Sequence, residues 1–101
     1  MRILLDTHVL LWALATPAKL PARFRRELDE AQVFVSAASI WEIAIKSALG
    51  KVEADPREVL DAVEPSGFEL LSVTGAHAAR VAALPPLHRD PFDRLLVAQA
   101  L

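Results

Sequence analysis

Four acidic residues of this 101-residue sequence stand where strands are expected to end or helices to begin: Asp6, Glu42, Asp90 and Asp93. Asp6 closes the short apolar run RILLD, and Glu42 lies in the first turns of a helix expected after QVFVS. Asp90 and Asp93 open the stretch DPFDRLLVAQAL, at the start of the last expected helix. Carboxylates in such places predict either helix caps or parts of a metal site.

The chemistry that several carboxylates support together is the binding of a hard divalent cation. In a parallel sheet, sites form outside the carboxyl ends of the strands, and right-handed crossovers bring the helix N-termini to that same edge. We therefore expect Asp6, Glu42 and Asp93 to converge. Carboxylates so placed repel one another unless a cation compensates, and oxygen ligands suit Mg²⁺ or Mn²⁺. Such an ion activates water and stabilises charge on a phosphoryl group.

Asp6 and Glu42 each have a hydroxyl-bearing neighbour with two possible roles. Ser39-Ile-Trp-Glu42 matches a helix capping box, and Glu42 is also placed to pair with Lys46 one helical turn later. In a metal site, the Ser39 hydroxyl would instead steady Glu42, and Thr7 would steady Asp6 or a metal-bound water. Thr7 is equally suited to cap the first helix, whereas Asp6 has no obvious capping task unless Thr7 begins that helix late.

The acids of the last helix also match a capping pattern. Asp90 is followed by Pro91, and proline at the first helical position after an acidic N-cap is a common helix start. Asp93 then takes the third helical position, where a carboxylate interacts favourably with the helix dipole. The sequence leaves the capping and the metal-binding interpretations open for both residues.

The elements that must position these acids follow from apolar runs and helix signals. Short apolar runs predict strands over Arg2–Asp6, Gln32–Ser36 and Phe68–Val73. Helical stretches lie between them, as in DPREVLDAVEPSG and in AASIWEIAIKSALGK, which closes at Gly50. Short strands that alternate with helices predict the α/β class, with a parallel sheet covered on both faces in a three-layer α/β/α arrangement.

Length and composition predict one domain, over residues 1–101. The absence of cysteine excludes a disulfide framework and thiolate chemistry. The net charge of −2 argues against a protein that holds nucleic acid by general electrostatics alone, but it leaves an RNA enzyme open. The longest apolar run, Val9 to Ala15, is too short to span a membrane, and the start does not resemble a signal peptide. We therefore expect a cytoplasmic protein without a membrane partner.

A hydrophobic content of 53% and a mean hydropathy of +0.32 are high for a domain that must hide its apolar surface alone. We expect part of that surface to face a partner through Trp12, Trp41 and Ile45. The helix from Thr7 is apolar nearly all round, and the third helix carries a second apolar side with Trp41, Ile45 and Leu49. Such a side fits a dimer interface or a groove for a partner helix, and complete burial is the alternative.

Three blocks, LLDTHVLLW, VSAASIWEIAIKSALGKV and HRDPFDRLLVAQA, resemble the signature blocks of PIN-domain proteins, most of all the VapC-type toxins of bacterial toxin–antitoxin pairs. In that family one acid ends the first strand, a second lies on the helix after the second strand, and a third precedes the helix of the last block. The resemblance assigns these catalytic and metal-binding positions to Asp6, Glu42 and Asp93. It makes Asp90, one turn earlier, an auxiliary acid.

The resemblance implies a Mg²⁺- or Mn²⁺-dependent endoribonuclease that is inhibited by a cognate VapB-type antitoxin and forms a homodimer. The family continues past this helix with another strand and a fourth acid, so we expect a domain that lacks its C-terminal strand region, since the sequence stops at Leu101. A catalytically incomplete module that binds antitoxin or RNA is the alternative function. A haloacid-dehalogenase-like phosphatase fits poorly, because His8 stands where it needs a second aspartate. Arg89 and Arg94 are candidates for phosphate contact.

Overall fold

The computed structural model of the chain describes residues 1–85 and 90–101, and its centre is a sheet of three parallel strands. The strands are β1 (Arg2–Leu4), β2 (Gln32–Ser36) and β3 (Glu69–Leu71), in the spatial order β1-β2-β3. Ile3 of β1 is opposite Val33, and Leu70 of β3 is opposite Val35. Because the strands are parallel, their carboxyl ends meet at one edge, as the sequence predicted.

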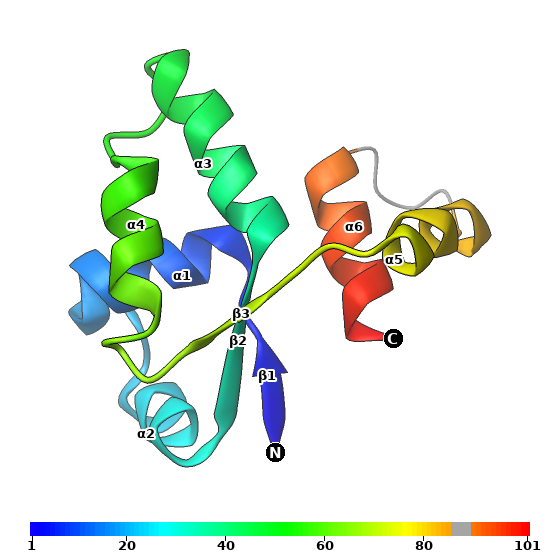
Figure 1. Cartoon of the computed structure of the whole chain (residues 1–101). Helices are drawn as coiled ribbons and strands as arrows, with labels where there is room; N and C mark the ends of the chain where they lie inside the picture. The colour runs from blue at the N-terminus through cyan, green and yellow to red at the C-terminus, as the bar shows by residue number, and fades with distance from the viewer. Residues whose placement is uncertain (86–89) are drawn as a thin grey trace.

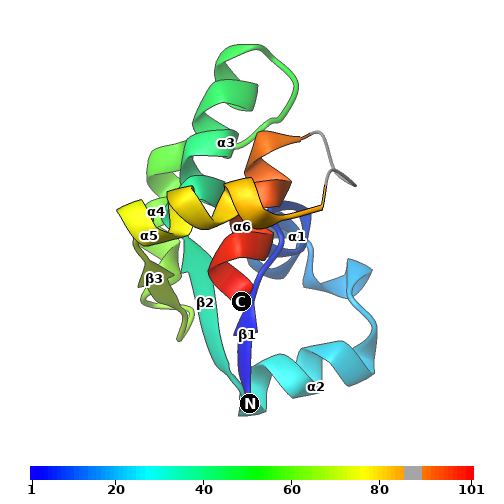
Figure 2. The same ribbon diagram turned by 90° about the vertical axis from the view of Figure 1, so that its right-hand side faces the viewer.

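Helices cover both faces of this sheet. They are α1 (Thr7–Ala15), α2 (Ala22–Glu30), α3 (Ala37–Ala48), α4 (Pro56–Val63), α5 (Gly75–Arg80) and α6 (Pro91–Ala100), with short 3₁₀ helices η1 (Pro17–Lys19) and η2 (Val81–Ala83). Figure 1 shows α1, α2 and α4 on one side of the strands and α5 and α6 on the other. Figure 2, a quarter-turn away, shows α5 and α6 in front of the strands. The predicted three-layer α/β/α arrangement is confirmed. No helix within the described ranges has the length and apolar character needed to cross a bilayer.

The apolar core lies between the sheet and the helices α1 to α4. Val33 and Val35 of β2 are at most 1% exposed, and they belong to one buried cluster with Leu10 of α1 and Ile43 of α3. Side chains alternate along a strand, so Ser36 does not share a face with its neighbour Val35. Its Oγ is hydrogen-bonded to Gln99 Oε1 of α6 at 2.5 Å. The middle strand thus holds α3 on the core side and α6 on the other.

The outer strands are shorter than the sequence predicted. β1 ends at Leu4 rather than at Asp6, although the backbone N–H of Leu5 still donates to Phe34 O of β2 at 3.0 Å. β3 covers Glu69–Leu71 instead of Phe68–Val73. The early end of β1 leaves Asp6 outside the sheet, at the point where the chain turns into α1.

The helix predicted over residues 55–67 ends at Val63. Pro65 has no backbone N–H to donate to the carbonyl group one turn earlier, so the series of helical hydrogen bonds is interrupted there. Gly67 has a φ of +83°, a left-handed value that glycine adopts without steric cost, and it directs the chain towards β3.

Candidate active site

Asp6 lies two residues beyond β1 and is the N-cap of α1. Its Oδ1 accepts a hydrogen bond of 2.8 Å from the backbone N–H of His8. The side chain is 53% exposed, and no hydrogen bond to Oδ2 from a described residue is present. The expectation that Asp6 has no capping task is therefore wrong. The strand ends at Leu4, so Asp6 adopts the extended N-cap conformation and Thr7 becomes the first helical residue.

Thr7, Ser39 and Glu42 form a buried polar cluster that links α1 to α3. Thr7 Oγ1 lies 2.8 Å from Glu42 Oε1 and 3.0 Å from Ser39 Oγ, and none of the three residues is more than 6% exposed. A carboxylate buried in this way needs donors, because an unpaired charge away from water is costly. The Thr7 hydroxyl therefore holds Glu42. The predictions that Thr7 contacts Asp6 or caps α1 are wrong, because its hydroxyl bonds Glu42 and the N-cap of α1 is Asp6.

The capping-box interpretation of Ser39 and Glu42 is wrong. α3 begins at Ala37 and its N-cap is Ser36, whose Oγ accepts a hydrogen bond of 3.0 Å from the N–H of Ala38. Ser39 and Glu42 lie inside the helix and are turned towards α1. The S-x-x-E pattern indicates Ser39 as the N-cap, but the serine that caps the helix is Ser36, three residues earlier.

Lys46 is the second partner of Glu42. Its Nζ lies 2.5 Å from Glu42 Oε2, one helical turn along α3, which confirms the predicted pair. The hydrogen bond with Glu42 raises the pKa of Lys46, burial opposes the rise, and the charges of Glu42, Asp90 and Asp93 add to it. The acids of α6 thus lie near enough for their charge to act on Lys46.

The N-terminus of α6 is built as the sequence predicted. Asp90 is the N-cap, and its Oδ1 accepts hydrogen bonds from the N–H groups of Phe92 at 2.8 Å and Asp93 at 3.3 Å. The Phe92 ring packs edge-on against Trp41 of α3, with 5.1 Å between ring centroids and 74° between planes. This aromatic contact holds the start of α6 against α3, beside the acids.

Asp6 and Asp93, from opposite ends of the chain, line one hollow of about 340 Å³. The rest of its lining is apolar and consists of Leu4, Leu5, Leu96, Val97 and Ala100. Glu42 is not part of this lining and faces Thr7 and Lys46 instead. The structure therefore brings Asp6 and Asp93 to a shared hollow, with Glu42 buried between α1 and α3.

The donor types fit a hard divalent ion, because all the candidate ligands are carboxylates. Within the described residues, no three His, Cys, Asp or Glu side chains gather closely enough to surround one ion. Mg²⁺ usually keeps several waters and binds one or two carboxylates directly. Asp6 and Asp93 are the two carboxylates that share one hollow, which matches that number of direct ligands.

The side chains that we expect to face a partner are exposed, so the alternative prediction, that they are completely buried, is wrong. Trp41 is 60% exposed and Ile45 is 37% exposed, and Leu49, the C-cap of α3, is 63% exposed, so an exposed apolar side chain recurs every four residues to the end of the helix. We call these three residues the α3 stripe. Trp12, 38% exposed, lines a separate hollow of about 330 Å³ between α1 and α4.

The arginine candidates for phosphate contact have other surroundings. Arg94 donates from Nη2 to Val81 O at 3.0 Å and from Nη1 to Pro85 O at 3.1 Å, so it fastens α6 to the segment after α5. Arg89 lies outside the described residues. Arg94 therefore has a structural role, and its contact with phosphate stays a prediction.

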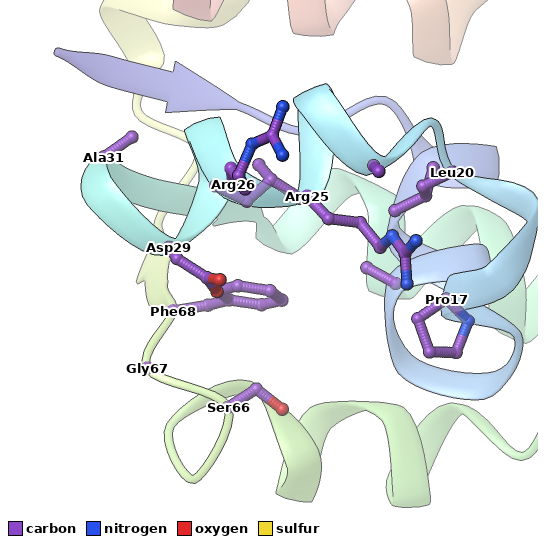
Figure 3. A pocket seen from close by; sticks show the side chains of 12 residues that line it. Pro17, Leu20, Arg25, Arg26, Asp29, Ala31, Ser66, Gly67 and Phe68 are labelled. Atoms are coloured by element: carbon purple, nitrogen blue, oxygen red, sulfur yellow. The ribbon is translucent and has the colours of Figure 1, made fainter.

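A larger hollow, of about 600 Å³, lies at the opposite edge of the sheet. Figure 3 shows Arg25 and Arg26 of α2 beside it, with Asp29 next to the ring of Phe68. α2 leads into the amino end of β2, and Phe68 directly precedes β3. The acids instead follow the carboxyl ends of the strands, so this hollow is not part of their site.

Comparison with known proteins agrees with this architecture. The family model described as PIN domain matches residues 3–101, which is nearly the whole chain. Among curated proteins, none matches the chain. PIN domains are generally nucleases and typically depend on divalent metal ions. With the parallel sheet and the acids at its carboxyl edge, the chain belongs to the PIN domain family.

Proposed function

We propose that the chain is a Mg²⁺- or Mn²⁺-dependent endoribonuclease with Asp6, Glu42 and Asp93 as its catalytic acids and Asp90 as an auxiliary acid. The observation that supports this most is the hollow shared by Asp6 and Asp93 at the carboxyl edge of the sheet. Glu42 is tied to the same region through Lys46, on which the charges of Asp90 and Asp93 act.

Asp6 and Asp93 would hold the ion in this hollow, with Glu42 as the third acid of the site. When bound, such an ion lowers the pKa of a water ligand and neutralises charge on the phosphoryl group. Hydrolysis forms a bond between the water oxygen and phosphorus and breaks the bond from phosphorus to the 3′ oxygen. The products carry a 5′-phosphate and a 3′-hydroxyl. The N-termini of α1 and α6 add positive dipole ends that favour an anionic substrate.

Thr7 and Ser39 have a positioning role in this proposal. Thr7 bonds Glu42 Oε1 and lies within hydrogen-bond distance of Ser39, so the pair fixes the carboxylate in one orientation. A carboxylate held in one orientation presents its oxygen atoms to a ligand without rearrangement, as a preorganised site requires.

The direct test is cleavage of a mixed RNA substrate by the wild-type chain with Mg²⁺ or Mn²⁺. Asp6→Asn and Asp93→Asn should each reduce cleavage by about a hundredfold or more, since each removes a charged ligand. Asp29→Asn, a change at the opposite edge of the sheet, should leave the rate unchanged. Undiminished cleavage in either site variant would remove that residue from the proposed site.

We further propose that the protein is a cytoplasmic VapC-type toxin neutralised by a VapB-type antitoxin. Trp12 and the hollow between α1 and α4 combine apolar side chains with the acids Glu53, Asp55 and Glu58, a combination that suits an amphipathic antitoxin helix. Growth arrest on induction, relieved by co-expression of an adjacent antitoxin gene, would support this role. Relief that persists unchanged in Trp12→Glu would place the antitoxin elsewhere.

The α3 stripe supports a homodimer as a separate part of the proposal. Three exposed apolar side chains on one helix face are typical of a partner surface. Light scattering on the wild type should give the mass of two chains, and Ile45→Glu should give the mass of one. A monomeric wild type would contradict the homodimer.

A binding module without cleavage is the second candidate. It is favoured by one observation: both oxygens of Glu42 are already engaged by Thr7 and Lys46. RNA binding by a chain that cuts no RNA with either metal would select this candidate over the nuclease.

A further inference from the structure

Lys46 occupies an unusual position for a lysine that pairs along a helix. Its side chain is only 31% exposed, and it contacts a carboxylate whose side chain is 4% exposed. The other carboxylate oxygen of Glu42, Oε1, accepts a hydrogen bond from the Thr7 hydroxyl, which is neutral. Lys46 is therefore the charged partner that compensates the buried Glu42.

The same ammonium group lies in the field of two further acids. Asp90 and Asp93, at the start of α6, both act on Lys46 by their charge. The Trp41–Phe92 contact between α3 and α6 holds these acids in that neighbourhood. Lys46 therefore contacts one carboxylate and lies in the field of two others, and it compensates negative charge there as a divalent ion would.

We propose that Lys46 is an internal counter-cation that stands in for the divalent ion at Glu42, and that its ammonium group must release Glu42 Oε2 for the ion to use that carboxylate. This inference rests on the proposed metal site. Lys46 is then a positioning residue that keeps Glu42 in place without metal and competes with the metal for it. Long lysine side chains turn easily towards solvent, so release requires no change in the backbone of α3.

The test compares Mn²⁺ binding by calorimetry in the wild type and in Lys46→Met, which keeps the chain length and removes the charge. Lys46→Met should bind Mn²⁺ about tenfold or more tightly, because a positive competitor has been removed from the carboxylates. Lys51→Met is the matched control, since Lys51 is exposed and lies three residues beyond the end of α3. Its Mn²⁺ affinity should equal that of the wild type. Equal or weaker binding by Lys46→Met would overturn the proposal.

A double-mutant cycle with Glu42→Gln separates competition from a general effect of charge. In the Glu42→Gln background, the contested carboxylate is absent, so Lys46→Met should change the affinity for Mn²⁺ much less. The same gain in both backgrounds would show that Lys46 acts only through its distant charge, and would overturn the proposal.

Stability gives a second readout that does not depend on cleavage. Lys46→Met should lose thermal stability in EDTA, and Mn²⁺ should restore it, since the ion takes over the compensation of Glu42. If the variant is unfolded in EDTA, Mn²⁺ should refold it, and failure to do so would contradict the inference. Failure of the proposed nuclease looks different: no RNA cleavage by the wild type at any Mn²⁺ concentration, whichever way Lys46→Met behaves.

Discussion

Replacing Thr7 with valine removes one hydroxyl from a buried contact and keeps the shape of the side chain nearly unchanged. Thr7 is 6% exposed, and its Oγ1 lies 2.8 Å from Glu42 Oε1. Valine at this position would place a methyl group against a carboxylate that is itself 3% exposed. Glu42 would keep Lys46 on its other oxygen and lose its donor on this one.

The cost of this change follows from the type of bond. Hydrogen bonds to charged groups contribute about 1.5–3 kcal/mol, and a buried acceptor left unpaired adds its desolvation. We expect Thr7→Val to lower the free energy of unfolding by about 2 kcal/mol. For a domain of this size that corresponds to a fall in Tm of about 8–16 °C.

Urea unfolding in metal-free buffer measures this loss. Thr16→Val is the matched control, because Thr16 is exposed and makes no side-chain capping bond, and its effect should stay within about 0.5 kcal/mol. A Thr7→Val variant as stable as that control would refute the reasoning. It would mean that the Thr7 hydroxyl does not hold the buried carboxylate.

Further predictions concern α6 and the core beneath the site. Asp90→Ala should lower the free energy of unfolding by about 1 kcal/mol, whereas Asp90→Asn, which can still cap the helix, should stay near the wild type in thermal melts. Phe92→Ala should cost about 1 kcal/mol from the lost aromatic pair and should reduce RNA cleavage, and wild-type cleavage would show that the Trp41 contact does not position α6. Ile43→Ala, at a residue 1% exposed, should cost about 3 kcal/mol by urea unfolding, and a loss below about 1 kcal/mol would contradict its place in the core.

The fold could be predicted from the sequence because its signals are local. β2 was placed at its observed bounds, Gln32–Ser36, since an apolar run between a charged helix and a serine cap has few alternatives. The edge strands were overestimated because apolar residues continue past the last ladder pair. At Asp6, the capping geometry depends on where the strand leaves the sheet, and no residue type in RILLD marks that point.

The candidate site could be predicted only in part, because its contacts join distant segments. The pairing of Glu42 with Lys46 follows from helical spacing, and it was predicted. The bond from Thr7 to Glu42 joins α1 to α3, whereas the sequence offers Glu42 a nearer partner in Ser39. The contact of Phe92 with Trp41 also joins distant segments, and the only local sign of it is the aromatic residue beside Asp93.

The central claim is that acids from distant parts of the chain act as one metal site at the carboxyl edge of the sheet. Mn²⁺ titration by calorimetry on the wild type, Asp6→Asn, Asp93→Asn and the control Asp29→Asn tests this claim most directly. We predict saturable binding by the wild type and by Asp29→Asn, and binding at least about tenfold weaker in each of the other two variants. Wild-type affinity in both Asp6→Asn and Asp93→Asn would contradict the claim, and would leave these residues as helix caps alone.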